Sequence, residues 1–480
     1  MAKKITSPAE DFSRWYLDVI REAELADTAP VRGCMIIRPY GYAIWENMKA
    51  SLDRRFKQTG HSNAYFPLFI PQSFITKESE HVDGFAPELA MVTHGGGKEL
   101  EEPLAVRPTS ETIINHMFSK WINSYRDLPM LLNQWANVVR WEKRTRPFLR
   151  TTEFLWQEGH TAHATEEEAR EETMRMLGVY EDFAREDAAI PVIAGLKTES
   201  EKFAGAVDTY AIEAMMRNGW ALQSGTSHYL GTNFARAFDT RFLDSDNEQK
   251  YVHQTSWGVS TRLVGALIMA HGDDHGLRLP PNLAPIQTVI VPIFRSDDDR
   301  TRVLEKAEEI RSRLADAGVR VELDDTEGAS PGFKFNHWEV RGVPLRLELG
   351  PRDLEEGHVM ASPRNRPGRG GKFTIPMEGL ADRVVERLEA IQAEMLADAT
   401  EYRDSRTFEI DSYQQLAQQL PGKPGFYRVW WAGGDEEEQR MKEETKATVR
   451  CIPLDQPGGA GKCFITGRET DRKAIVARAY

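Results

Sequence analysis

The chain of 480 residues has only three cysteines, Cys34, Cys451 and Cys463. Three cysteines cannot form a disulfide framework and fit a reducing compartment, so we expect a cytoplasmic protein. The N-terminal MAKKITSPAEDF lacks the apolar segment of a signal peptide, and no apolar run is long enough to cross a bilayer. With 40% hydrophobic and 28% charged residues, the composition predicts an ordinary globular chain without a membrane partner.

The familiar nucleotide-binding loops are missing as well. Gly461-Lys462 has Gln456 where a P-loop needs its first glycine and Cys463 where it needs a hydroxyl, and no G-x-G-x-x-G opens a helix after a strand. If this protein uses ATP, it does so without a P-loop or a dinucleotide crevice. The net charge of −13 disfavours nonspecific affinity for nucleic acid, so DNA is not an expected partner. A local basic face remains compatible with phosphate contacts.

Three regions without internal repeats are expected. Residues 1–283 alternate helical patterns with short apolar strands, as in an α+β domain. The Pro-rich LPPNLAP (279–285) predicts a linker. Residues 286–396 show a β-α-β order, which predicts a small α/β domain with a partly parallel sheet. Residues 405–480 form a third, small region, and its apolar ending KAIVARAY predicts a docked C-terminus, because chain ends are usually polar and frayed.

Several local elements follow from patterning. We expect an amphipathic helix over 7–26 opening at Ser7, a second helix over 41–57 and a strand over 63–71 limited by prolines. Thr165 and Glu168 form a capping-box signature that opens an acidic helix. The segment 250–272 begins as a strand and becomes a helix, and 300–317 reads as a long charged helix.

The segment 140–163, RWEKRTRPFLRTTEFLWQEGHTAH, carries the strongest functional pattern. Arg140 and Glu142 are two apart, so on a strand they share one face, and a charged, Pro-containing loop follows. Beyond the loop, Phe154, Trp156, Glu158 and His160 recur at period two and share a face. This pattern suits a pocket for a flat ring, a polyphosphate and an ammonium group; the alternative is a surface hairpin with scattered salt bridges.

Metal and nucleophile patterns are weaker. His271-Gly-Asp-Asp-His275 and the pair His160 and His163 offer ligands for a metal hydrolase, but spacing alone is little evidence, and the first reads equally well as a helix end and turn. No G-x-S-x-G is present, so Ser110 and Ser227 are expected to donate hydrogen bonds rather than to attack a substrate.

Taken together, the segments resemble class II aminoacyl-tRNA synthetases, and within them the prolyl-tRNA synthetase family of the archaeal and eukaryotic type. RGCMIIRPYGYAIWENM and GHSNAYFPLFIP resemble the first class II signature, Arg140-x-Glu142 with RTTEF the second, and TSWGVSTRLVGAL the third. RPTSE resembles the Thr-x-Glu loop of the prolyl family. LQSGTSHYLGTNFARAF is similar to its next block, GFKFNHWEVRGVPLRLELGPRDLE to its anticodon-binding domain, and the final ARAY to its aromatic C-terminus.

The resemblance implies an α+β fold. Residues 1–283 would form the antiparallel-sheet catalytic domain, 286–396 an α/β anticodon-binding domain and 405–480 a small α+β C-terminal domain. It implies that L-proline is activated by ATP, with Mg²⁺, and transferred to the proline tRNA by a homodimer. The first-signature helix and strand would form the dimer interface.

The resemblance also assigns residues. Arg140 would bind the α-phosphate and Arg262 the γ-phosphate, and these two arginines would be the catalytic residues. The implied ATP-binding set is Arg140, Glu142, Arg150, Phe154, Gln223 and Arg262. The implied proline-binding set is Thr109, Glu111, Arg140, Trp156, Glu158, His160, Phe203, His228 and Trp257. The anticodon candidates are Lys334, Glu339, Arg346, Arg352 and Asp353.

Two departures from the family carry expectations. Where many relatives have a four-cysteine zinc site, this chain has Ala432, Glu437, Cys463 and Thr466, so we expect no structural zinc. The segment 164–222 is too short to hold the bacterial editing domain, so we expect no hydrolysis of alanyl-tRNA.

The basic stretch 361–372 either contacts tRNA phosphates or is a mobile loop. A silent tRNA-binding paralogue is the main competing hypothesis, although both phosphate-binding arginines are present.

Overall fold

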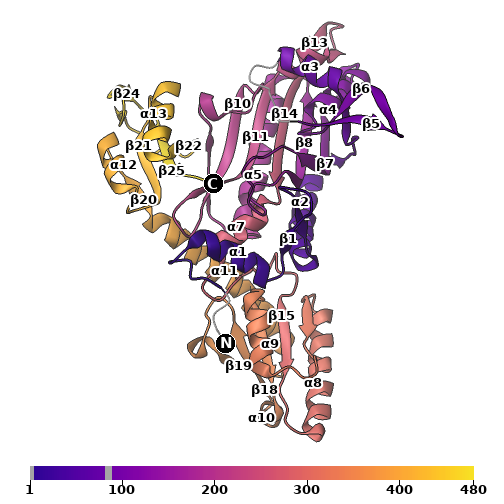
Figure 1. The fold of residues 1–480 in the computed structure, drawn as a ribbon, viewed down its shortest axis with the longest axis vertical. Coiled ribbons are helices and arrows are strands. Elements are labelled where there is room, and N and C mark those ends of the chain that lie inside the picture. Colours follow the sequence, from indigo (N-terminus) through magenta and orange to yellow (C-terminus); the bar gives the residue numbers. More distant parts are fainter. Residues whose placement is uncertain (1–4, 82–88) are drawn as a thin grey trace.

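A computed structural model describes residues 5–81 and 89–480, and a long mixed sheet of eleven strands runs through it, in the order β20-β21-β25-β22-β9-β10-β11-β14-β8-β7-β3 (Figure 1). Its central strands pair antiparallel, which confirms the expected antiparallel sheet. These strands are β7 (Met130–Val139), β8 (Glu153–His163), β9 (Val192–Leu196), β10 (Asp208–Met215), β11 (Ala221–Gly231) and β14 (His253–Ser260).

Strand β8 gives the sheet two different faces. It pairs antiparallel with β7, where Val139 lies opposite Glu153 at one end of the pair and Met130 opposite Ala162 at the other. On its other side it pairs with β14. The odd-numbered residue Gln157 faces helix α5 (Glu166–Glu186), where its Oε1 accepts a hydrogen bond of 2.6 Å from the Tyr180 hydroxyl. Successive side chains of a strand alternate, so the even-numbered side chains of β8 lie on the opposite face.

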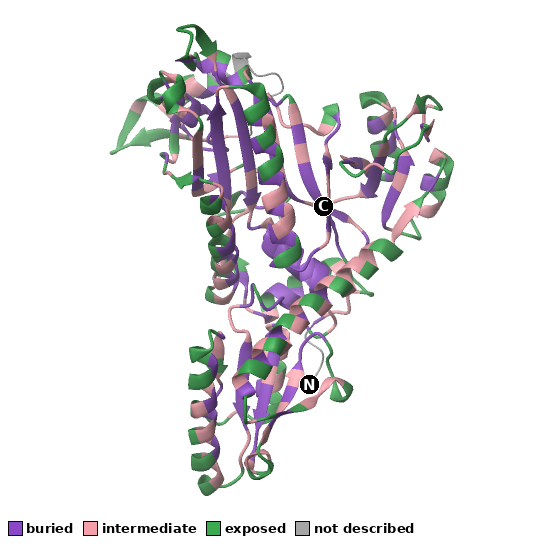
Figure 2. Cartoon of the chain, turned by 180° about the vertical axis from the view of Figure 1, so that it is seen from behind, coloured by how far each residue is buried: buried purple, intermediate pink, exposed green. Residues whose placement is uncertain are grey.

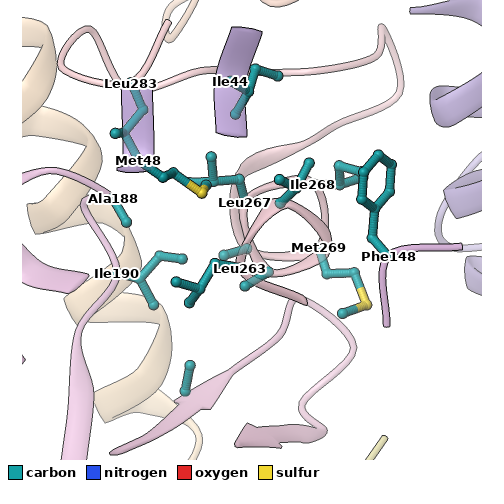
Figure 3. Close-up of a cluster of buried hydrophobic side chains, with 14 of the residues drawn as sticks. Ile44, Met48, Phe148, Ala188, Ile190, Leu263, Leu267, Ile268, Met269 and Leu283 are labelled. Atoms are coloured by element: carbon teal, nitrogen blue, oxygen red, sulfur yellow. The ribbon is translucent and has the colours of Figure 1, made fainter. Parts of the chain in front are cut away.

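The helical face holds the main core. Helix α5 begins with the predicted capping box, in which Glu168 N donates to Thr165 Oγ1 over 3.2 Å. It packs beside α2 (Pro39–Gln58), and α7 (Arg262–His271) packs against α2 and α1 (Phe12–Glu22) in the same core. Figure 3 shows α7 surrounded by apolar side chains from α2, from the segment 188–190 and from Leu283. Figure 2 shows the buried strands lying behind the exposed outer surface of α5.

Smaller elements cover the outer end of the sheet. A three-stranded sheet has the order β4-β6-β5, and α4, α6 and the hairpin β12-β13 pack nearby around Phe118 and Phe242. Their bounds are β4 (Phe69–Pro71), β5 (Ala90–Gly95), β6 (Lys98–Val106), α3 (Gln72–His81), α4 (Glu111–Trp121), α6 (Asn233–Phe238), β12 (Arg241–Leu243) and β13 (Gln249–Tyr251). A separate pair joins β1 (Ala26–Thr28) to β2 (Met35–Ile37), and β3 (Ser62–Asn63) ends the main sheet.

The second region is a five-stranded sheet of order β16-β15-β17-β18-β19, at the lower end of Figure 1. Strand β15 is parallel to β16 and β17, while β17/β18 and β18/β19 are antiparallel, which confirms the partly parallel sheet. Its elements are β15 (Thr288–Pro292), α8 (Asp297–Asp316), β16 (Val321–Leu323), α9 (Pro331–Val340), β17 (Leu345–Leu349), α10 (Pro351–Glu356), β18 (His358–Pro363), β19 (Phe373–Pro376) and α11 (Leu380–Ser405).

The third region extends the main sheet instead of forming a sheet of its own. Strand β22 pairs with β9, so that Ile452 lies opposite Leu196. Across this join, Arg450 donates to both oxygens of the fully buried Glu213 over 3.1 and 3.0 Å, and Lys197 Nζ donates to the Arg450 carbonyl over 2.7 Å. The elements are β20 (Thr407–Glu409), α12 (Tyr413–Gln419), β21 (Phe426–Trp430), α13 (Asp435–Thr445), β22 (Ala447–Pro453), β23 (Gly461–Lys462), β24 (Glu469–Thr470) and β25 (Lys473–Arg478).

Three local expectations need correction, and one helix was not expected. Helix α1 starts at Phe12 with Asp11 as its N-cap, and the chain is already a strand at Ala26, so the 7–26 helix is shorter than predicted. The expected strand 63–71 is interrupted around Pro67: its two ends lie in different sheets, as β3 and β4. The 279–285 linker is packed, because Leu279, Leu283 and Ala284 belong to the main core. Helix α9 was not predicted.

The C-terminus is docked, as predicted. Tyr480 N donates to Ala221 O over 3.2 Å, and the Tyr480 hydroxyl accepts a 2.8 Å hydrogen bond from Asn218. The guanidinium of Arg146, from the 140–152 loop, lies 5.4 Å from the centre of the Tyr480 ring. Among the described helices, none is both long and apolar enough to span a bilayer.

The junction of the first and third regions predicts a stability effect. Removing one partner of a buried ion pair costs about 3–5 kcal/mol, because the other charge stays buried without compensation. We therefore expect Arg450→Met to lower the midpoint of urea unfolding and to expose the third region to limited proteolysis. Arg440→Met, which removes an exposed arginine paired with Glu444 on α13, is the matched control and should leave both unchanged. Equal behaviour of the two variants would contradict the assignment.

Candidate active site

A cavity of about 510 Å³ lies on the face of the sheet opposite α5. The even-numbered residues of β8 form its floor, together with parts of β11 and β14, the loop 108–111 and the start of α7. The expected ATP and proline residues that line it are Thr109, Glu111, Arg140, Phe154, Trp156, Glu158, His160, Phe203, Gln223, His228, Trp257 and Arg262. Strand alternation is therefore what gathers the predicted residues of β8.

One end of the cavity is cationic. The Arg140 guanidinium lies 5.5 Å from the centre of the Phe154 ring and 5.4 Å from that of Trp156, and its Nε donates to Pro108 O over 3.0 Å. Arg262 Nε donates to Leu149 O over 3.2 Å. Burial, and then the charges of Arg150 and Arg140, lower the pKa of Arg262 to about 10. Neither Arg140 nor Arg262 forms an ion pair within the described chain, so both charges are available to an anion.

The other end contains a buried carboxylate that protein donors already surround. Glu158 accepts hydrogen bonds from Ser110 N over 3.2 Å, from Gln134 Nε2 over 2.9 Å and from the Ser110 hydroxyl, and His160 Nε2 lies 3.0 Å from its Oε2. Burial by itself would raise the pKa of Glu158, but the hydrogen bond and charge of His160, with the bonds from Ser110 and Gln134, hold it below its usual value. Glu158 therefore stays charged and fixes Ser110.

The loop 108–111, which Glu158 holds through Ser110, places Thr109 and Glu111 at the cavity. Both side chains are buried at the cavity wall, and the Thr109 hydroxyl donates to Glu111 Oε2. Glu111 forms no ion pair with a cation in the described part of the chain. Arg107, which sequence reasoning missed, anchors the loop from behind through bonds of 2.7 Å to Phe66 O and 2.8 Å to Asn137 O.

The protonation of the two cavity histidines differs. Burial alone would lower the pKa of His160, but the bond to Glu158 and the charges of Glu111 and Glu158 raise it above its usual value. Burial and then the charge of His160 lower the pKa of His228 to about 3, so that this ring is neutral. His228 Nδ1 lies 3.0 Å from Thr209 Oγ1, and the ring packs on Phe203 at 4.7 Å between centroids.

Three of the predicted site residues lie differently from the others. Trp257 pairs with Gly159, an odd-numbered position, and its indole packs against Phe56, His61 and Tyr180 on the helical face, so the indole belongs to the core although Trp257 is among the residues that line the cavity. Glu142 and Arg150 are outside the cavity lining and pair with each other at 3.6 Å on the 140–152 loop. This loop also holds Arg140 and Glu142, which are therefore not on a strand.

Other lining residues carried weaker signals. Ser256 lies opposite His160 and Gly258 opposite Glu158, so strand pairing would have found them once the register was known. Glu201 and Lys202 lie in a short segment after β9 and had no recognisable pattern. Ser110 and Ser227 act as donors, as expected, and the Ser227 hydroxyl binds Thr173 O over 2.7 Å.

A resident metal ion does not fit this site. Among the described residues, Glu111, Glu158 and His160 bring ligand atoms within 4.8 Å of one another. The oxygens of Glu158 are already occupied by protein donors, whereas Mg²⁺ needs near-octahedral oxygen ligands and retains waters. The two metal patterns seen in the sequence do not form metal sites either. His160 and His163 lie on opposite faces of β8, and Asp273 of the 271–275 segment pairs with Arg364.

The expected zinc-site positions have other structural roles. Glu437 Oε2 accepts a hydrogen bond of 2.8 Å from Gly434 N at the start of α13. The Cys463 side chain is buried, which by itself would raise its pKa, but bonds from the Thr466 hydroxyl and from nearby backbone amides lower it. Cys463, Phe464, Trp431 and Met441 pack in one apolar cluster, so packing holds this region together.

The anticodon candidates separate into two groups. Glu339 and Arg346 line a second cavity of about 400 Å³ that also includes His275 and Trp338. Lys334 is buried beneath it and donates to Asp324 O over 2.7 Å, which corrects the expectation of an exposed base-reading side chain. Asp353 accepts from Gly350 N over 2.7 Å as the cap of α10, and Arg352 is exposed on the same short helix.

The basic stretch 361–372 is largely ion-paired. Arg364 binds Asp273, Arg366 binds Asp398 and Lys372 binds Glu348, at 2.6, 2.8 and 2.6 Å. Arg369 lines the second cavity. Whether this stretch contacts tRNA phosphates stays a prediction, and the ion pairs tie three of its side chains to neighbouring segments.

This fold and site define a class II aminoacyl-tRNA synthetase. Residues 92–271 match the family described as tRNA synthetase class II core domain (G, H, P, S and T), residues 287–387 match an anticodon binding domain, and residues 413–480 match the prolyl-tRNA synthetase C-terminal family.

Whole-chain comparisons agree. The chain is 56% identical over 478 residues to the proline–tRNA ligase of Roseiflexus sp. (strain RS-1), covering 99% of each. It is 57% identical over 482 residues to the chloroplastic/mitochondrial proline–tRNA ligase of Arabidopsis thaliana, covering 100% of this chain and 88% of that one. The prolyl-tRNA synthetase of Cryptosporidium parvum, solved with halofuginone and AMPPNP, matches with a TM-score of 0.94 and 39% identity over 100% and 99% of the two chains. The chain belongs to the prolyl-tRNA synthetase family: it uses ATP to join proline to tRNA.

The pair of His160 and Glu158 predicts a pH dependence of stability. His160 has a raised folded pKa, so its contribution is fully present below the ordinary imidazole value of about 6.5 and is lost as the pH rises through the raised value. The difference in melting temperature between wild type and His160→Gln should therefore be largest near about pH 6 and should shrink toward alkaline pH. The exposed His94 gives the control His94→Gln, for which we expect no such trend. A difference that grows with pH would contradict the ion pair.

Proposed function

We propose that the 510 Å³ cavity is the site of prolyl-adenylate formation and that its two ends have separate tasks. Arg140 binds the α-phosphate and Arg262 the γ-phosphate of ATP, Phe154 stacks on adenine, and Gln223 adds a polar contact. Thr109 and Glu111 bind the secondary ammonium of proline. Trp156, His160, Phe203 and His228 shape the pyrrolidine pocket. The supporting observation is that two arginines without ion-pair partners and a carboxylate without one face the same cavity, within the described chain.

The chemistry needs these charges. A carboxylate oxygen of proline attacks the α-phosphorus while the bond from that phosphorus to the α,β-bridging oxygen breaks, which gives prolyl-adenylate and releases pyrophosphate. A ribose hydroxyl of the tRNA terminus then attacks the prolyl carbonyl, and AMP leaves. Attacking group and phosphate are both anionic in the first step, so neutralisation and alignment by arginines are the main requirements. We propose that Mg²⁺ enters with ATP, on the polyphosphate.

The second region is proposed to read the tRNA anticodon. Exposed hydrogen-bonding and stacking groups are what single-stranded bases require. Glu339, Arg346, Trp338 and His275 provide them around the 400 Å³ cavity. Arg352 is retained as a candidate because it is exposed, whereas Lys334 is buried on Asp324 and Asp353 caps α10.

Assembly and location are further proposals. The first-signature segment exposes several large apolar side chains: Ile36 is 51%, Tyr42 42%, Tyr65 74% and Phe69 45% exposed. Large exposed apolar patches mark interaction sites, and we propose that these side chains form such a patch and are covered in a homodimer. Sedimentation equilibrium giving the monomer mass at micromolar concentration would contradict this. The unpaired cysteines support a cytoplasmic location.

Amino-acid-dependent ATP–pyrophosphate exchange tests the assignment of the cavity. Proline should support rapid exchange. Alanine should support it about 10–200-fold less well, because missing methylenes are worth only about 1–3 kcal/mol, and the chain alone should not hydrolyse alanyl-tRNA. Arg140→Ala should lower exchange by at least about 100-fold, as expected when a preorganised donor to developing charge is lost.

Glu339→Gln is the matched control in the second region. It should spare proline exchange and weaken tRNA charging. Exchange with no amino acid would favour the silent paralogue, and unimpaired exchange in Arg140→Ala would contradict the proposed phosphate site.

A further inference from the structure

An arginine links the 400 Å³ cavity to the end of the helix that begins with Arg262. Arg364 follows β18 in the second region, and its side chain is only 4% exposed. Its Nη1 and Nη2 donate to the two carboxylate oxygens of Asp273 over 2.7 and 2.6 Å. Its Nε donates to the carbonyl oxygen of Glu339 over 2.9 Å. One planar guanidinium thus joins the end of the first region to the wall of the 400 Å³ cavity.

Asp273 lies two residues beyond the end of α7, the helix that begins with Arg262. Its carbonyl oxygen accepts a 2.9 Å bond from Trp15 Nε1, so its backbone is held as well. Burial alone would raise the pKa of Asp273, but the hydrogen bonds and charge of Arg364 keep it lowered, so that the pair is ionic. A helix of ten residues is a rigid rod about 15 Å long, so the position of its last turn determines that of its first.

Backbone hydrogen bonds also join the segment after Asp273 to the end of α9 and the segment after it. Leu277 N donates to Val340 O over 2.9 Å, and Leu279 N donates to Gly342 O over 3.1 Å. Glycine is needed at 276 and 342, because a Cβ there would lie 2.6 Å from Val340 O and from Leu277 Cβ. The end of α9, which carries Glu339, is therefore held against the segment that follows α7.

We propose that Arg364 is a positioning residue that couples occupancy of the 400 Å³ cavity to the placement of Arg262. This inference rests on the proposed function, since it takes the cavity to bind an anticodon base and Arg262 to bind ATP. A base that engages Glu339 acts on the peptide that Arg364 holds, and the bidentate bond transmits that displacement to Asp273. The rigid guanidinium fork makes this connection; a lysine in its place would form one flexible bond.

The test measures how strongly catalysis depends on the anticodon. The steady-state kcat for charging is measured with a tRNA(Pro) transcript and with the same transcript carrying replaced anticodon bases. The ratio of the two values is the anticodon dependence. We expect Arg364→Lys and Asp273→Asn each to reduce this ratio by about 5–150-fold, the usual range of coupling between sites. Proline-dependent exchange without tRNA and the Kd for the tRNA(Pro) transcript should stay within about threefold of wild type, because the direct contacts remain.

The matched control is Arg366→Gln, which removes a charge from the same loop. Arg366 binds Asp398 over 2.8 and 3.1 Å and makes no described contact with Asp273 or Glu339, so its anticodon dependence should equal that of wild type. An unchanged ratio in Arg364→Lys and Asp273→Asn overturns the inference. So does an equal loss of exchange and charging in these variants, which would mark a purely structural pair. If wild type itself shows no anticodon dependence, the proposed anticodon site fails, and the inference fails with it.

Discussion

The active site depends on one buried, charged carboxylate. Glu158 is placed on the cavity face by the pairing of β8 with β7 and β14, and taking such a charge out of water is costly unless hydrogen bonds and an opposite charge compensate. His160, Gln134 and Ser110 provide that compensation. Ser110 is the residue between Thr109 and Glu111, so the same bonds that stabilise Glu158 also fix the loop that we propose binds the amino acid. The hydrogen bonds that keep Glu158 charged in the interior therefore also hold Thr109 and Glu111 at the cavity wall.

In the proposed function, the division of charge in the cavity explains how ATP is bound without a P-loop. A P-loop binds phosphates with backbone amides at a helix start. Here an antiparallel sheet presents side chains from neighbouring strands, and arginines provide the positive charge. Arg262 begins a helix whose remaining residues are core, and Arg140 lies beside two aromatic rings at the end of β7. Rigid surroundings limit the reorganisation that each arginine needs when an anion arrives.

Much of this could be predicted from the sequence, and the exceptions have physical causes. Period-two alternation predicted the cavity face of β8, and the capping box predicted the start of α5 to the residue. The resemblance assigned Trp257 to the pocket, and the sequence could not show which face of the sheet its indole takes, because that face depends on the register between two strands far apart in the chain. An odd-numbered partner, Gly159, turns the indole toward the core. Lys334 could not be told from an exposed lysine, because its partner Asp324 is placed by tertiary packing. Glu158 was expected beside the substrate, and only the structure shows its bonds to Ser110.

The most direct measurement is a crystal structure of the chain with a non-hydrolysable prolyl-adenylate analogue. The account predicts that the pyrrolidine nitrogen lies within hydrogen-bonding distance of Glu111 and Thr109, the phosphate on Arg140 and the adenine against Phe154, while Glu158 keeps its bonds to Ser110 and touches no ligand atom. An analogue whose amine binds Glu158 directly, with Ser110 released, or that occupies another cavity, would contradict it.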